Sequence, residues 1–187
     1  MIRGYRHEDE AAVRRVVTEA FGDQGETVAA LVAELRATHG RVELVAEEGG
    51  AVVGHVLLSR SWVDARRALV EVLVLSPLGV LPAHQGRGWG TVLVAAAIAE
   101  ARRVGAPAVF LEGSPDYYGA RGFEAATPRG FGRPSTRVPE PGFQVAVLDA
   151  HEEWMTGALV YCEPFWTHDC VGLRDPRLSE IEQMFES

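Results

Sequence analysis

The sequence contains no lysine: all 18 of its basic residues are arginine. A P-loop nucleotide site needs a lysine that reaches the terminal phosphates, so this class of phosphate site is excluded. Cysteine is scarce, since Cys162 and Cys170 are the only two, and they supply neither a zinc-ligand set nor a disulfide framework. The six histidines lack the close spacing of metal ligands. We therefore expect no metal site.

Long apolar runs and an excess of basic charge are also missing. No stretch approaches the roughly 18 apolar residues of a transmembrane helix, and the first ten residues, MIRGYRHEDE, hold no apolar signal-peptide core. The net charge of -8 argues against nonspecific nucleic-acid binding, which depends on phosphate neutralisation by basic residues. It is compatible with cationic substrates such as amines. We expect a cytoplasmic protein that binds neither nucleic acid nor membranes.

The composition itself is that of an ordinary globular protein. Hydrophobic residues make up 47% and charged residues 24% of the 187 residues. A chain of this length is typical of one domain with a substantial buried core. We find no internal repeat and no linker. The sequence predicts a single domain over 1–187, with its core over about 1–161 and a C-terminal tail over 162–187.

Hydrophobic periodicity predicts a mixture of helices and strands. Helical spacing of apolar residues is found over 8–21, 26–39, 91–104, 115–120 and 176–185. Strand patterns cover 2–4, 42–46, 51–63, 69–81, 108–112, 143–148 and 157–161, the last two as a pair. The segment 125–142 has four prolines and three glycines, and we interpret it as a long surface loop on the substrate side. This order of elements predicts a mixed α/β fold.

The most informative local pattern is LPAHQGRGWG over 81–90, between an apolar strand and an alanine-rich helix. Amides at the start of a helix lack intrahelical partners, and the helix dipole favours an anion there. Glycines let this backbone approach a phosphate closely, and Arg87 offers a charged side chain. A dinucleotide-binding pattern needs a third glycine where this chain has Thr91. The glycines alone leave open a phosphate-binding loop and a tight strand-to-helix turn.

Two strings resemble motifs of one family. QGRGWG over 85–90 resembles the coenzyme A-binding motif of the GNAT superfamily of N-acetyltransferases, and YYGARGF over 117–123 resembles a second motif of that superfamily. The second string is similar to that of predicted bacterial acetyltransferases of unknown substrate. The resemblance implies the acyl-CoA N-acyltransferase fold, with a central mixed sheet splayed at the coenzyme site and flanking helices. It also implies transfer of an acetyl group from acetyl-CoA to a primary amine of a small molecule or peptide.

The resemblance further implies which residues form the site. The backbone amides of Leu78 and Val80 would face the thioester carbonyl and the pantetheine arm. Tyr118 would return a proton to the coenzyme thiolate, whereas Tyr117 would only pack. The remaining coenzyme contacts would come from the loop and the start of the next helix, through Gln85, Gly86, Arg87, Gly88, Trp89, Gly90 and Thr91.

A general base has to take a proton from the attacking amine. Our candidate is Glu112, at the end of the apolar strand AVFLE, where some members of the superfamily place a glutamate. Glu71 and the pair His168–Asp169 are weaker alternatives. A non-catalytic acyl-CoA-binding or protein-interaction module that retains the fold is the alternative function. The last strands and the tail are the candidate interface of a homodimer.

Overall fold

The structure is a computed structural model that describes residues 1–186, so Ser187, the last residue of the predicted domain, lies outside the described residues. The strands are β1 (Ile2–Gly4), β2 (Gly40–Glu48), β3 (Ala51–Ala65), β4 (Leu69–Val80), β5 (Ala108–Glu112), β6 (Glu124–Ala125), β7 (Phe131–Gly132), β8 (Phe143–Val147) and β9 (Gly157–Val160). The α-helices are α1 (Glu10–Phe21), α2 (Gly25–Thr38), α3 (Trp89–Arg103), α4 (Pro115–Gly119), α5 (Glu163–Thr167) and α6 (Arg177–Glu186). Every predicted helix and strand is present, with ends within about two residues of the prediction. The short elements β6, β7 and α5 were not predicted.

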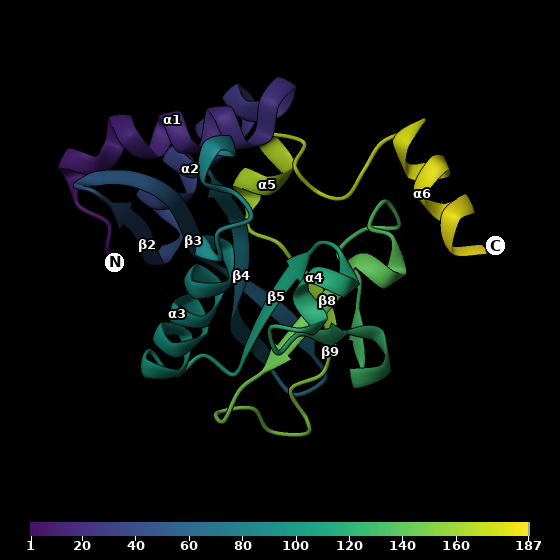
Figure 1. The fold of residues 1–187 in the computed structure, drawn as a ribbon. Helices are drawn as coiled ribbons and strands as arrows, with labels where there is room; N and C mark the ends of the chain where they lie inside the picture. Colours follow the sequence, from purple (N-terminus) through teal and green to yellow (C-terminus); the bar gives the residue numbers. More distant parts are fainter. Residues whose placement is uncertain (187) are drawn as a thin grey trace.

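These strands form one mixed sheet in the order β1-β2-β3-β4-β5-β8-β6, with β7 and β9 off this path. The pair β4–β5 is parallel, and its neighbours β3–β4 and β5–β8 are antiparallel. Helices cover both faces of the sheet (Figure 1). The mixed α/β class is therefore confirmed. None of the helices in the described part of the chain has both the length and the apolar character that a membrane crossing needs.

Side chains of the central strands alternate between two buried clusters. Val72 and Val74 of β4 pack in one cluster with side chains of α1 and α2, whereas Leu73 and Leu75 pack in the other with side chains of α3. A strand that is covered on both faces needs apolar residues at successive positions rather than at alternate ones. This explains the nearly continuous apolar sequence of β4.

The segment 125–142 lies mostly at the surface, as its prolines and glycines predicted, but three of its residues anchor it in the core. It includes β7 and buries Ala126, Phe131 and Val138, each at most 2% exposed. The Phe131 ring packs edge-on against Phe110 of β5, with ring centroids 4.9 Å apart. These anchors were not predicted, because single apolar residues among turn-forming residues carry no periodic signal.

The strands β8 and β9 follow each other in the sequence but do not pair with each other, contrary to the prediction. β8 lies between β5 and β6, whereas β9 pairs with β3 and β7. β2 pairs with β3 only as far as Ser59. Beyond that point β3 pairs with β9 instead, and Trp62 lies opposite Val160. β7 pairs with only the first two residues of β9, so among residues 1–186 Leu159 and Val160 have a strand partner on the β3 side alone.

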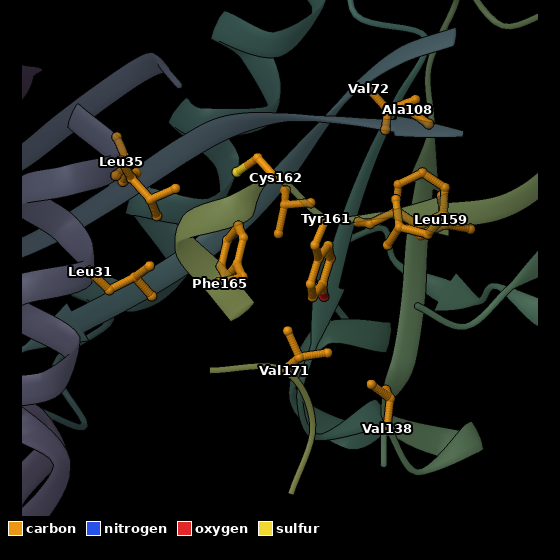
Figure 2. Close-up of a cluster of buried hydrophobic side chains, with 14 of the residues drawn as sticks. Leu31, Leu35, Val72, Ala108, Val138, Leu159, Tyr161, Cys162, Phe165 and Val171 are labelled. Atoms are coloured by element: carbon orange, nitrogen blue, oxygen red, sulfur yellow. The ribbon is translucent and has the colours of Figure 1, made fainter. Parts of the chain in front are cut away.

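The packed core continues past residue 161, where the sequence pattern placed its end. Cys162, Phe165 and Val171 are at most 1% exposed. Figure 2 shows them with Tyr161 and with Leu31 of α2 in one apolar cluster. By contrast, α6 stands away from this body at the end of an extended connection (Figure 1). The residues after β9 therefore belong to the core as far as Val171.

We predict that Phe131→Ala lowers the free energy of unfolding by about 3–5 kcal/mol, since it removes a fully buried aromatic ring. Chemical denaturation followed by circular dichroism measures this loss. Leu69→Ala is the control, because Leu69 is 60% exposed and its truncation should change stability by no more than about 0.5 kcal/mol. Equal stability of the two variants would contradict the anchoring of the 125–142 segment in the core.

Candidate active site

The parallel strands β4 and β5 are paired over only a short distance. Leu73 lies opposite Val109 and Val74 opposite Phe110, and the pairing ends there. Both strands continue beyond this point, and they run apart in Figure 1. The splayed sheet that the resemblance implied is therefore present.

A β-bulge lies in β4 where this strand leaves β5. Along the ladder with β3, Leu75 lies opposite Leu58 and Leu78 opposite Val56, so β4 has one extra residue in this interval. Pro77 lies within the interval, and proline cannot donate a hydrogen bond to a ladder. The regular pairing of β4 with β3 is therefore interrupted at Pro77.

The amides of Leu78 and Val80 face the gap between the two strands. The Leu81 amide donates to the Val53 carbonyl of β3 at 2.9 Å, and successive amides along a strand point to opposite sides. The amides one and three residues earlier, those of Val80 and Leu78, therefore point away from β3, toward the side from which β5 has diverged. An N–H group in this position can stabilise negative charge that develops on a carbonyl oxygen.

A cavity of about 560 Å³ lies between the end of β4 and the start of α3, and we call it the loop cavity. It brings together every predicted coenzyme-binding residue except Arg87, and also the predicted acid Tyr118. Its lining consists of Leu78, Val80, His84, Gln85, Gly86, Gly88, Trp89, Gly90, Thr91, Tyr117, Tyr118 and Arg121.

The loop cavity opens onto the amino terminus of α3, a helix of 15 residues whose N-cap is Gly88. The amides of the first helical turn have no carbonyl partner within the helix, and the helix dipole makes this end positive. Gln85 fixes the loop to the strand, because its Nε2 donates to the Val80 carbonyl at 3.0 Å. The geometry is that of an anion site at a helix terminus.

Arg87 does not line the loop cavity. Its guanidinium is paired with the Glu48 carboxylate at 3.0 and 3.1 Å. Arg121 lines the cavity instead: its guanidinium lies 3.6 Å from the centroid of the Tyr117 ring and donates to the Thr91 hydroxyl at 2.7 Å. The contacts of Arg121 recorded within the described chain are with neutral groups of Thr91 and Tyr117. Sequence reasoning missed Arg121, which lies two residues after the end of α4.

Tyr118 projects from α4 into the loop cavity and is partly buried. Burial raises the pKa of Tyr118 to about 12, so its hydroxyl is protonated at neutral pH and can donate a proton. Its ring packs against Gly113, where a Cβ atom would lie 2.5 Å from a ring carbon. Since Gly113 directly follows Glu112, the acid and base candidates flank the same short stretch of backbone.

A second cavity, of about 510 Å³, adjoins the loop cavity along β4, and we call it the Glu112 cavity. Pro77 lines the Glu112 cavity, and the next residue, Leu78, lines the loop cavity. The two cavities therefore meet at this point of β4. Its other walls come from the end of α1, from α2, from the end of β5 and from the residues after β9. The predicted base and the predicted acid thus lie in neighbouring cavities.

Glu112 is held in its cavity by two donors. The Tyr161 hydroxyl donates to Oε1 and the Gly172 amide donates to Oε2, both at 2.9 Å. Burial raises the pKa of the Glu112 carboxyl, whereas these two hydrogen bonds and the nearby charge of Arg137 partly oppose the rise. A fixed carboxylate with a raised pKa is suited to accept a proton near neutral pH. No local pattern links Tyr161 or Gly172 to Glu112, and sequence reasoning missed both.

The alternative bases are less well placed. Glu71 is paired with Arg41 at 3.0 Å and lines neither of the two cavities. His168 lines the Glu112 cavity, but its Nε2 lies 2.7 Å from the Glu34 carboxylate. Within residues 1–186 no group of three His, Cys, Asp or Glu side chains is arranged to hold a metal ion.

The chain is similar to known acetyltransferases. The model of the acetyltransferase (GNAT) family matches residues 10–126. The uncharacterized N-acetyltransferase YjhQ of Escherichia coli (strain K12) is 31% identical over 162 residues, which cover 83% of this chain and 88% of the relative.

Two solved structures are also similar. The GNAT family N-acetyltransferase YhbS of Escherichia coli, in complex with CoA, has a TM-score of 0.80 and 27% identity, over 88% of this chain and 91% of that one. A GNAT family acetyltransferase of Brucella melitensis, in complex with acetyl-CoA, has a TM-score of 0.68 and 32% identity, over 88% of this chain and 97% of that one. The matched family region includes the bulge of β4, the glycine loop and the tyrosines of α4. The chain belongs to the GNAT family of acetyltransferases.

Proposed function

We propose that the chain transfers the acetyl group of acetyl-CoA to a primary amine by direct attack of the amine on the thioester. The main observation behind this proposal is that two cavities adjoin each other at the bulge of β4. One cavity presents backbone amides and a positive helix terminus, and the other presents a fixed carboxylate. We treat residues 1–187 as one catalytic domain.

The loop cavity is the proposed coenzyme site. The amides at the start of α3 would receive the pyrophosphate, with Arg121 as the cationic side chain beside it. The Val80 amide would contact the pantetheine arm, and the Leu78 amide the thioester carbonyl. The complexes of the Escherichia coli and Brucella melitensis relatives with CoA and acetyl-CoA support this assignment. Arg87 contributes only if it leaves Glu48.

The proposed reaction follows from the positions of Glu112, Leu78 and Tyr118. The neutral amine nitrogen attacks the thioester carbonyl carbon and, as the C–N bond forms, gives a proton to Glu112, directly or through a water molecule. The carbonyl oxygen gains negative charge, which the Leu78 amide stabilises. As the C=O bond forms again and the C–S bond breaks, Tyr118 gives its proton to the departing thiolate. Glu112 then releases its proton to solvent and Tyr118 regains one, so both groups return to their starting states.

We predict that acetyl-CoA raises the melting temperature of the protein, because a ligand that binds only the folded state stabilises it by roughly 2.7 kcal/mol at a hundredfold excess over Kd. Gly88→Asp should abolish this shift, since it places a carboxylate where the pyrophosphate would bind. Gly105→Asp, at the other end of α3, is the matched control: both glycines have positive φ and open space around a Cβ atom. Loss of the shift in both variants, or in neither, would contradict the assignment.

We predict that Tyr118→Phe lowers kcat by roughly 10²–10⁴-fold, because the thiolate then leaves without a positioned acid. The thermal shift produced by acetyl-CoA should stay the same, because the ring and its packing against Gly113 are retained. Normal turnover in this variant would refute the assignment of the acid. Coenzyme binding by the unaltered protein without turnover of any amine would favour the non-catalytic alternative.

We predict an acidic limb in the pH profile of kcat/KM that reports the Glu112 carboxyl. Tyr161→Phe removes a donor that favours the charged carboxylate, so the pKa of Glu112 rises and the limb moves to higher pH. Glu112→Gln should remove the limb and lower kcat by roughly 10²–10⁴-fold. Tyr5→Phe is the control, since Tyr5 lines neither cavity. A limb at the same pH in Tyr161→Phe and the unaltered protein would show that another group titrates.

A further inference from the structure

We infer that the acceptor is a monoamine whose body is uncharged, without a carboxylate or a second ammonium group. This inference rests on the proposed transferase function and on the Glu112 cavity as the acceptor site. Two observations support this inference. One is that most charged groups in the wall of the Glu112 cavity are already paired, and the other is that the remaining side chains of the wall are neutral.

Two carboxylates line the Glu112 cavity in the described chain, and only one is available to a ligand cation. Asp169 is bonded to the Arg174 guanidinium through both of its oxygens, at 2.7 and 2.8 Å, and Arg137 lies 3.4 Å from it. Glu112 is hydrogen-bonded only to neutral donors, the Tyr161 hydroxyl and the Gly172 amide. The cavity therefore offers one position for an ammonium group, beside Glu112.

Cationic side chains are missing from the wall of this cavity as far as residue 186. Its lining includes no arginine, and its one histidine, His168, is already bound to the Glu34 carboxylate. A carboxylate or phosphate on the acceptor would enter this cavity without a partner, and burial of an unpaired charge is costly. Amino acids and phosphorylated amines are therefore poor acceptors.

The rest of the wall suits an uncharged body. Its less polar part is formed by Phe21, Val28, Leu31, Pro77, Phe165, Cys170 and Leu173. Figure 2 shows Leu31, Phe165 and Tyr161 as neighbours in the buried cluster, and the rings of Phe165 and Tyr161 have centroids 4.7 Å apart. Neutral polar side chains, those of Gln24, Thr27 and Ser76, complete the lining and can bond a hydroxyl group or a ring nitrogen. A polyamine or an aminoglycoside would have to leave its further ammonium groups unpaired.

The test is a set of acceptors in matched pairs that differ by one charge. Phenylalanine adds a carboxylate to 2-phenylethylamine, and 1,5-diaminopentane adds an ammonium group to pentylamine. With saturating acetyl-CoA, we expect kcat/KM to be at least about tenfold higher for the uncharged-body member of each pair, which corresponds to about 1.4 kcal/mol. Turnover that is equal or faster for either charged member would overturn the inference and leave the transferase function standing. No turnover of any amine would overturn the transferase function and the inference with it.

A charge placed in the wall makes the test independent of the chosen amines. Thr27 lies on the exposed side of α2 and lines the cavity, so a substitution there leaves the core intact. Thr27→Asp should raise kcat/KM for the diamine relative to pentylamine by about tenfold, because the second ammonium group gains a partner. Thr27→Arg should do the same for phenylalanine relative to 2-phenylethylamine. Thr38→Asp, at the far end of α2 and outside the cavity, should leave both ratios unchanged. Unchanged ratios in the Thr27 variants would show that the acceptor binds elsewhere.

Discussion

The end of pairing between β4 and β5 is the constraint on which the rest of the site depends. After Val74 meets Phe110, the bulge at Pro77 turns β4 away, and the amides of Leu78 and Val80 are left facing a gap. Buried amides without partners are costly, so a sheet opens in this way only where something else supplies the acceptors. The carbonyl groups of an acyl-pantetheine arm have the required chemistry and the extended shape.

The two cavities along β4 carry opposite charge requirements. The loop cavity has the positive terminus of α3 and the Arg121 guanidinium, whereas the Glu112 cavity has one available carboxylate. An anionic coenzyme and a cationic amine would therefore be drawn to different sides of the same bulge. Electrostatic complementarity of this kind gives specificity and orientation more than affinity. In the proposed reaction, the two substrates would meet at Leu78, where the two cavities adjoin.

Glu112, at the end of β5, is held by residues that come much later in the chain. The residues after β9 are buried against α2 and supply both donors that hold the carboxylate. The same packing removes water from the carboxylate, and this desolvation is the main cause of its raised pKa. The packing of Tyr161 and of the segment that contains Gly172 therefore has two effects on the proposed base. It fixes the position of the Glu112 carboxylate, and it raises the pKa of that carboxyl.

Local features were predictable from the sequence because their causes are local. Apolar periodicity located the helices and strands, and the glycines of 86–90 marked the start of α3. The coenzyme-binding residues and Tyr118 were implied by the resemblance to the GNAT superfamily, and all but Arg87 line the loop cavity. The order of the elements thus followed from the amino-acid sequence by itself.

Tertiary structure alone decided the features that depend on contacts between distant segments. Arg87 is drawn to Glu48, 39 positions away, so Arg121 is the cation of the loop cavity. The 125–142 segment is anchored in the core, because the Phe131 ring packs against Phe110 of β5. Glu112 is a held carboxylate rather than a solvated strand end, because Tyr161 and Gly172 fold onto it. Sequence periodicity reports which residues are apolar, whereas the partner of a charge is set by which segments the fold brings together.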